Sequence, residues 1–585
     1  MPRGQRSPRE RRSTTDSQLS VGSAESGSST SRSGATSPLP PGSIGSTFLS
    51  DSSYRFWKDP MGFVQGKVAD HGSVFKCRIM NQSTIVVASH AVAAEVLGGS
   101  SAGAFSLSQG YSQFMDGIFG ENVLLSDGPT HQRLAGVLHE VMGPDAVAAG
   151  QFERRIAAVV ADVEVFFTKR VACCDKPLDL YEALKEAATR ASLSLCLGVD
   201  VLDDVAVAHL TELTRTHWHG IISVPLQLRI PGTSFMQSRR SAAAGAADAL
   251  RTLIGARYDE AAAVAVAAGG VGDGAAAGEA AEGGGVVDGG AGGGGAGGSV
   301  FDSLRQVLDR DESIEQALLF ISALVPKAIA ALMTQLLLAL DGPSGGGGGQ
   351  TLKEAARGDD NVLAMVLAEV ERCYPPFFAC LRVCTETTEI GGHTFPKGYR
   401  VMVVVPLCNG DPAAFRDGDR FSPSRWAARD SSTAATASTA DTPGGADGGA
   451  LVDGEDVAPQ AVPAAAAAAA ADGAAPPGAA GAGPVPMAND LFTYGGGPRA
   501  CIGRHLMRPL LRGLASMIVT KFEWKIAAAD TRKLKWLPTM RPVAPVETTF
   551  WPRAAGGPLP AQPKAVGADR DGAHGPLRYP RTSIE

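Results

Sequence analysis

The sequence is poor in charged residues, and neither sign dominates. Charged residues make up 19% of the 585 residues, with 53 lysines and arginines against 60 aspartates and glutamates and a net charge of −7. A dedicated nucleic-acid-binding protein carries a concentrated basic footprint, which this balance does not provide. Hydrophobic residues at 44% and aromatic residues at 6% suit the core of an enzyme-sized globular domain and exclude a chain that is disordered throughout.

The sequence also lacks a disulfide framework and a secretory signal. Its nine cysteines are odd in number and scattered, which favours a reducing compartment with mostly buried thiols. Residues 1–38 are rich in arginine and serine and poor in acids, and no apolar segment of the signal-peptide kind follows them. This composition is typical of an organellar transit peptide and equally of a disordered tail, so both interpretations stay open.

No membrane anchor is expected. The longest apolar stretch, residues 317–340, has Pro326 and Lys327 near its middle. A lysine at the centre of a bilayer costs roughly 2.5–3.5 kcal/mol on insertion scales, so a buried core helix is the better interpretation. We expect an intracellular protein, in an organelle such as the plastid or otherwise cytoplasmic or membrane-associated through peripheral contact.

Glycine and proline, in contrast, are abundant. The 71 glycines and 37 prolines exceed what a compact fold of this length needs, and they gather in low-complexity segments. These are predicted to be loop insertions at about 259–299, 345–349 and 431–483, with loose tails at 1–38 and 551–585. What remains within 39–550 suits one large domain better than several small ones.

The hydrophobic spacing of that domain predicts mainly helices with small sheets. Residues 73–89 and 388–405 carry the β-branched, alternating pattern of strand pairs with turns between them. The spacing is helical over 152–197 and 304–340. Asp311 and Ser313 are candidate N-caps of the second helical segment.

The sharpest local feature is a glycine-rich loop that runs from Tyr494 to Gly503 and contains Cys501. A helical pattern begins directly after the cysteine, so the helix N-terminus, backbone N–H groups and the Arg499 cation would all stabilise a thiolate there. A cysteine of lowered pKa in a rigid loop is what a thiolate metal ligand requires. The alternative, a glycine-rich turn with an incidental cysteine, would be favoured if this motif stood alone.

Two further motifs accompany it. Glu369 and Arg372 form E-x-x-R near the end of a helical segment, on one helix face. Phe421 to Trp426 form F-x-P-x-R-W, which supplies Arg425. Together with the cysteine loop, these motifs closely resemble the signature of the cytochrome P450 superfamily, and the resemblance runs from about residue 39 to 550. It implies the cytochrome P450 fold and haem b as cofactor.

The resemblance also implies a role for individual residues. Cys501 matches the axial thiolate ligand of the haem iron, and Glu369, Arg372 and Arg425 match a buried structural ion triad. Arg499, Arg382 and His131 match the positions that bind the haem propionates. Tyr494, Gly497 and Gly503 belong to the cofactor-binding loop.

One segment departs from the family pattern. Pro326 and Lys327 stand where the long helix of the family usually carries an acid and an alcohol that deliver protons to bound dioxygen. We therefore include both among the candidate catalytic residues with Cys501. Three functions stay open: a monooxygenase, a hydroperoxide isomerase, dehydratase or peroxygenase, and a haem-binding protein without turnover.

The resemblance finally implies partners. An apolar substrate of the lipid, terpenoid, sterol or retinoid kind is expected, with a P450 reductase or ferredoxin as electron donor. Arg504, His505 and Arg508 follow the cysteine and are candidates for a basic rim that receives this donor. No nucleic-acid partner is expected.

Overall fold

The computed structural model describes residues 37–45, 51–99, 103–173, 176–221, 234–269, 298–341, 351–427, 491–527 and 533–553. The chain separates into two units, residues 1–37 and 38–585, and all the helices and strands below belong to the second. The predicted insertions at 345–349 and 431–483, and most of both predicted tails, lie outside the described residues. At the predicted insertion 259–299, helix α10 continues to Gly269, where an alanine-rich sequence favours helix.

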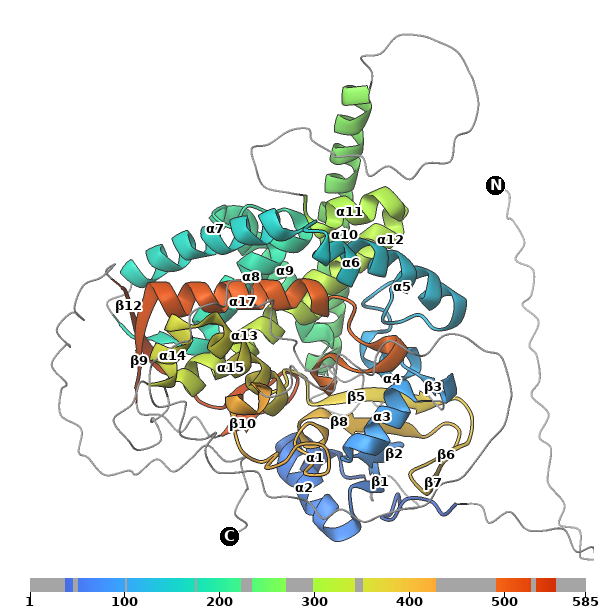
Figure 1. The fold of residues 1–585 in the computed structure, drawn as a ribbon. Coiled ribbons are helices and arrows are strands. Elements are labelled where there is room, and N and C mark those ends of the chain that lie inside the picture. Colours follow the sequence, from blue (N-terminus) through green and yellow to red (C-terminus); the bar gives the residue numbers. More distant parts are fainter. Residues whose placement is uncertain are drawn as a thin grey trace, which may run out of the picture. The chain divides into compact units, whose positions relative to one another are not determined.

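Helices dominate the described residues and the sheets are small, as predicted (Figure 1). The α-helices are α1 (Ser53–Lys58), α2 (Pro60–His71), α3 (His90–Gly98), α4 (Ser108–Met115), α5 (Gly128–Met142), α6 (Pro144–Ala148), α7 (Glu153–Ala172), α8 (Leu180–Leu197), α9 (Asp204–Ile221), α10 (Ser234–Gly269), α11 (Val300–Val307), α12 (Arg310–Leu319), α13 (Val325–Leu340), α14 (Leu352–Gly358), α15 (Asp360–Cys373), α16 (Val405–Cys408) and α17 (Arg504–Lys521). Short helical segments of other types are η3 (Phe320–Leu324), η4 (Pro423–Trp426), η5 (Phe492–Tyr494) and η6 (Gly497–Arg499).

Four small sheets accompany the helices. The largest has the order β1-β2-β8-β5-β3, a second has the order β4-β12-β9, and two hairpins pair β6 with β7 and β10 with β11. The strands are β1 (Val74–Ile79), β2 (Gln82–Val87), β3 (Phe105–Ser106), β4 (Leu178–Asp179), β5 (Ala379–Cys384), β6 (Thr388–Ile390), β7 (His393–Phe395), β8 (Arg400–Val404), β9 (Phe522–Ile526), β10 (Leu534–Lys535), β11 (Arg541–Pro542) and β12 (Glu547–Pro552).

The predicted strand pair at 73–89 is the hairpin β1–β2. Ile79 pairs with Gln82, and the two residues between them, Met80 and Asn81, have φ of 56° and 57°. Positive φ at both central residues is what a tight hairpin turn with the right twist requires. The pair predicted at 388–405 divides: β6 and β7 form a hairpin around Gly391 and Gly392, whereas β8 joins β2 and β5 in the large sheet.

The predicted helical segment 304–340 divides into the end of α11 and one continuous helical run from Arg310 to Leu340. A break at Leu308 ends α11, α12 follows, and the π-helical segment η3 joins α12 to α13. The continuous run from Arg310 to Leu340 is long and apolar enough to cross a membrane, but 75% of its most apolar window is buried inside the fold. It is therefore the core helix that the sequence predicts, packed against α8 and α15.

The predicted N-caps of this segment are wrong. Asp309 caps α12, because its carboxylate accepts a hydrogen bond of 2.8 Å from the backbone N–H of Glu312. Asp311 and Ser313 lie inside the helix, and the Ser313 hydroxyl is buried and donates to the carbonyl of Leu308. The helix starts earlier than predicted because the chain turns directly after the buried Leu308.

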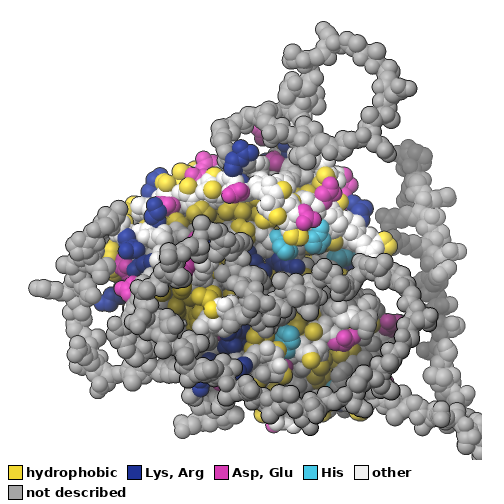
Figure 2. Space-filling model, in the orientation of Figure 1, with side chains coloured by type: hydrophobic (Ala, Val, Ile, Leu, Met, Phe, Trp, Pro, Cys, Tyr) yellow, Lys and Arg dark blue, Asp and Glu magenta, His cyan; other side chains and the backbone are white. Residues whose placement is uncertain are grey.

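Surface charge on the unit is mixed. On the face drawn in Figure 2, Lys and Arg side chains are interspersed with Asp and Glu side chains. This distribution agrees with the nearly balanced composition and gives that face no basic footprint for a nucleic acid.

We predict that Asp309→Ala lowers the free energy of unfolding by about 1 kcal/mol, the usual cost of losing an N-cap. Asp311→Ala is the matched control, because the Asp311 side chain is 93% exposed in the same helical turn. Its removal loses only the interaction with the helix dipole and should lower the free energy of unfolding by about 0.3 kcal/mol. Urea denaturation of both variants measures the difference. An Asp311→Ala effect as large as that of Asp309→Ala would contradict the assigned cap.

Candidate active site

The loop that holds Cys501 is shaped by glycine and by contact with α3. Gly497 has φ of 61°, and a Cβ there would lie 2.2 Å from the carbonyl oxygen of Leu97. Only glycine fits a left-handed conformation so close to a neighbouring backbone. A hydrogen bond of 2.8 Å from the Cys501 N–H to the Tyr494 carbonyl closes the loop, and α17 begins at Arg504 as predicted.

The thiol of Cys501 faces a large cavity. Its surface is accessible because it lies on the wall of a cavity of about 950 Å³, while the surrounding protein removes it from bulk water. Burial raises the pKa of Cys501, and hydrogen bonds from the backbone N–H groups of Gly503 and Arg504 lower it only in part. The lowered pKa predicted from sequence is therefore wrong for the thiol by itself; a bound cation would be needed to hold the thiolate.

Apolar side chains form most of the cavity wall. Helix α13 contributes Val325, Ala328 and Ile329, and α9 contributes Trp218. The cysteine loop contributes Cys501. Further apolar residues come from α4 and the five-stranded sheet: Tyr111, Phe114, Met115, Leu381 and Met402. A cavity of this size and polarity is typical of a site for an apolar small molecule.

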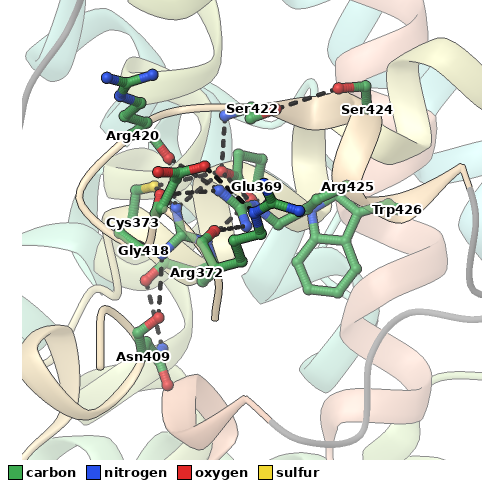
Figure 3. A network of polar contacts seen from close by, with 12 residues as sticks. Glu369, Arg372, Cys373, Asn409, Gly418, Arg420, Ser422, Ser424, Arg425 and Trp426 are labelled. Carbon is green, nitrogen blue, oxygen red and sulfur yellow. Dashed lines mark hydrogen bonds and ion pairs between the residues drawn. The ribbon is translucent and has the colours of Figure 1, made fainter. Parts of the chain in front are cut away.

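The predicted ion triad is assembled around the Glu369 carboxylate (Figure 3). Arg372 donates from Nε at 3.0 Å and from Nη2 at 2.8 Å, and Arg425 Nε donates at 3.1 Å. The indole Nε1–H of Trp426 and the N–H of Ser422 complete the set at 3.0 and 2.8 Å. Glu369 and Arg372 are fully buried, and both carboxylate oxygens accept hydrogen bonds, so neither is left unsatisfied.

A second buried acid, Glu371, holds the cysteine loop through Tyr494; the sequence interpretation missed it. Glu371 accepts a hydrogen bond of 2.7 Å from the Tyr494 hydroxyl and pairs with Arg508 at 3.3 Å. The Arg508 guanidinium also lies over the Tyr494 ring. The Arg508 side chain is only 17% exposed and is paired with Glu371. It therefore stabilises the cysteine loop and adds little to an exposed basic surface.

Comparison with known proteins agrees with this architecture. A family model described as Cytochrome P450 matches residues 346–439. Cytochrome P450 26B1 of Bos taurus is 19% identical over 521 residues, covering 88% of this chain and 87% of that protein. Cyclooctat-9-en-7-ol 5-monooxygenase of Streptomyces melanosporofaciens is 38% identical over 61 residues, 10% of this chain and only 13% of that relative's length.

Two solved structures show the same fold. Retinoic acid-bound cyanobacterial CYP120A1 has a TM-score of 0.59 at 17% identity, over 88% of this chain and all of that one. Cytochrome P450EX alpha (CYP152N1) with myristic acid has a TM-score of 0.56 at 16% identity, over 89% of this chain and all of that one. The chain belongs to the cytochrome P450 superfamily. Its family and fold make it a haem-thiolate oxidoreductase.

The residues that P450 resemblance assigns to the haem propionates lie around the same cavity. Arg382, Arg499 and His131 all line it. Burial, followed by the nearby Arg499 charge, lowers the pKa of His131 to about 4, so the imidazole is neutral at neutral pH and can donate only a neutral N–H hydrogen bond. Arg499 pairs with Asp127, a carboxylate that the sequence interpretation did not single out.

The residues present fit a haem. The Cys501 thiol on the cavity wall accepts hydrogen bonds from two backbone N–H groups. Arginine and histidine side chains that can donate to carboxylates line the same cavity, and the remaining wall is mostly apolar. Among the predicted loop residues, Tyr494 and Gly503 line the cavity, whereas Gly497 does not. Gly497 packs against Leu97 and Gly98 of α3 and shapes the loop.

Pro326 and Lys327 are the two residues of the long helix that the sequence interpretation included among the catalytic candidates. Neither belongs to the cavity wall, which α13 forms with Val325, Ala328 and Ile329. Pro326 has no N–H to donate to the carbonyl of Ser322 four residues earlier, and the Lys327 ammonium donates to that carbonyl instead, at 3.2 Å.

Lys327 is held away from the cavity wall, against Trp218. Its Nζ lies 4.2 Å from the centre of the Trp218 ring, and it is Trp218 that lines the cavity. Nearby, His217 Nδ1 lies 2.9 Å from the Ser322 hydroxyl. Burial lowers the pKa of Lys327 to about 7.

This pKa gives a prediction with a definite sign. Between about pH 7 and the ordinary lysine pKa near 10.4, the unfolded chain binds a proton at Lys327 that the folded protein does not. The stability of the wild type relative to Lys327→Met should therefore rise with pH across this window, by at most about 1.4 kcal/mol per pH unit.

Denaturation of both proteins at pH 7, 8 and 9 measures this slope. Lys521→Met is the control, since Lys521 pairs with Glu164 near the surface, its side chain is 58% exposed, and its removal should leave the pH dependence unchanged. Parallel curves for the wild type and Lys327→Met would show that Lys327 keeps its proton in the folded state.

Proposed function

We propose that this P450 is a monooxygenase that inserts one oxygen atom from dioxygen into an apolar substrate. The observation that carries the proposal is the Cys501 thiol on the wall of a large apolar cavity that Arg382, Arg499 and His131 also line. When bound, haem b ligated by Cys501 supplies the oxidising chemistry, and thiolate ligation favours O–O cleavage. Electrons would come from a P450 reductase or a ferredoxin.

The chain's own residues hold the ligand and control water and protons. Trp218, Phe320 and Ile329 form apolar wall and exclude water from the reacting carbon. The backbone N–H groups of Gly503 and Arg504 donate toward the Cys501 sulfur and so stabilise its negative charge. Glu371 holds the Tyr494 hydroxyl and thereby fixes the loop that carries the sulfur.

A second function is favoured by one observation on the long helix. All the described residues that α12, η3 and α13 contribute to the cavity wall are apolar: Leu319, Phe320, Val325, Ala328, Ile329 and Leu332. These side chains offer neither the acid nor the alcohol that relays protons to bound dioxygen. A hydroperoxide isomerase, dehydratase or peroxygenase begins with an O–O bond already formed and would need no such relay.

The similar proteins support an apolar, lipid-like or terpenoid-like substrate. The Streptomyces relative is named cyclooctat-9-en-7-ol 5-monooxygenase, and two structures of the same fold contain retinoic acid and myristic acid. We extend the same class to this cavity. The arginine-rich and serine-rich composition of residues 1–38 supports the further proposal of an intracellular, organellar location.

We predict that Cys501→Ser abolishes the thiolate-type haem spectrum, because a serine hydroxyl is too weakly acidic and too hard a ligand to replace the sulfur. The reduced-CO difference spectrum measures it. Cys380→Ser is the matched control, because Cys380 lines the same cavity and its replacement should leave the spectrum intact. A thiolate spectrum that survives Cys501→Ser, or is lost with Cys380→Ser, would overturn the ligand assignment.

The oxidant is predicted to be dioxygen with a reductant. Product formed per electron consumed should then be high, and a lipid hydroperoxide should support little turnover. A barrier difference of only about 1.4 kcal/mol separates the two routes tenfold in rate, so parallel assays discriminate them. Fast turnover with hydroperoxide and almost none with dioxygen would establish the second function, and no turnover in either assay would indicate a haem-binding protein alone.

A further inference from the structure

An arginine occupies the first position of an otherwise apolar central strand. Strand β8 reads Arg400, Val401, Met402, Val403, Val404, and every one of these residues is buried. Arg400 is 2% exposed and is among the residues that line the large cavity. A guanidinium remains protonated in proteins, so a full positive charge lies beside a mostly apolar space.

The described residues satisfy this charge only in part. Arg400 Nη2 donates to Oε1 of Gln113 at 2.5 Å, whereas the buried Nε has no partner. No carboxylate of the described residues pairs with Arg400, and burial is the cause that lowers its pKa. By contrast, the equally buried Arg372 is paired with Glu369 and bonded to three backbone carbonyls.

An unpaired buried charge of this kind is costly, because the charge has lost its contact with water and gained no counterion in return. The missing acceptor has to be an anion or a strong hydrogen-bond acceptor. A carboxylate matches the planar guanidinium best, because it can accept two parallel N–H bonds.

The haem propionates are not the anion that this geometry favours. In the β5–β8 ladder Arg382 is paired with Val401, so those two share one face of the sheet and Arg400 lies on the other. The Arg382 face packs with Leu97, which contacts the cysteine loop at Gly496. Arg400 lies on the same face of the sheet as Met402, two residues along β8. Met402 packs with Phe56 and Phe75.

We propose that Arg400, assisted by Gln113, binds the carboxylate of an amphipathic acid substrate whose apolar part fills the cavity. The substrate class is a long-chain or terpenoid carboxylic acid. Phe56, Tyr111 and Phe114 line the cavity with Arg400 and provide the apolar surface that such a chain requires. The inference refines the function proposed above and rests on it, because it names the chemistry of the substrate for the same cavity.

The test measures binding rather than turnover. Haem-loaded full-length protein is titrated calorimetrically at pH 8 with myristate and with 1-tetradecanol, which has the same chain without the charge. We expect the wild type to bind myristate about tenfold or more tightly than the alcohol, a difference of about 1.4 kcal/mol. Arg400→Met should abolish this preference by weakening myristate binding while leaving tetradecanol binding unchanged.

Two variants serve as controls. Lys535→Met removes a cation that lines the same cavity but is exposed, and it should keep the preference for myristate. Arg400→Lys keeps the charge and should restore part of it. Circular dichroism and haem content check that Arg400→Met is folded; if it is not, the acid-to-alcohol ratio of the wild type and its Arg400→Lys variant still decides the question.

Each remaining outcome has a definite meaning. Equal affinity of the wild type for myristate and tetradecanol would overturn the proposal, and so would an unchanged preference in Arg400→Met. Loss of haem from Arg400→Met without a selective effect on myristate would assign the anion to a haem propionate and overturn it as well. None of these results alters the thiolate spectrum of the wild type, whereas absence of that spectrum would contradict the proposed function itself.

Discussion

The carboxylate of Glu369 is the interaction on which the active-site scaffold depends. Arg372 binds it and, with the rest of its guanidinium, donates to the carbonyls of Asn409, Gly418 and Arg420. The Asn409 side chain in turn donates to the Thr493 hydroxyl and accepts from the N–H of Phe492. A single buried acid on α15 therefore orders the segment that follows β8 and, through Asn409, the beginning of the cysteine loop. Its value lies in this geometry, since a buried ion pair by itself is weak grounds for net stability.

The cysteine loop is organised for a ligand that brings positive charge with it. Burial raises the pKa of Cys501, and the backbone N–H groups of Gly503 and Arg504 only partly oppose this. The nearby Arg508 is paired with Glu371, so much of its charge is already neutralised. The protein thus positions the sulfur, and a haem iron held by Cys501 would supply the positive charge that stabilises a thiolate there.

The sequence predicted what depends on neighbours along the chain. The β1–β2 hairpin, α15 and α17 follow from hydrophobic spacing and turn residues, and the contacts of Glu369 follow from motifs. The N-cap was misassigned because Asp309 and Asp311 are equally good cap residues, and only the packing of Leu308 decides between them. Glu371 and Arg400 were missed because their partners lie more than a hundred residues away. An arginine opening an apolar strand was the one sequence signal available for Arg400.

The position of Lys327 away from the cavity wall has a geometric cause that also explains the chemistry of the cavity. The π-helical segment η3 inserts extra backbone into one turn, so a face assigned by regular helical spacing before Phe320 is rotated after Leu324. The buried ammonium then lies away from the cavity wall, where it replaces the N–H that Pro326 lacks and donates to the carbonyl of Ser322. The side chains left facing the ligand are apolar. Polar recognition has to come from elsewhere on the wall, and the charge of Arg400 on the five-stranded sheet can orient a substrate without any polar contact from the long helix.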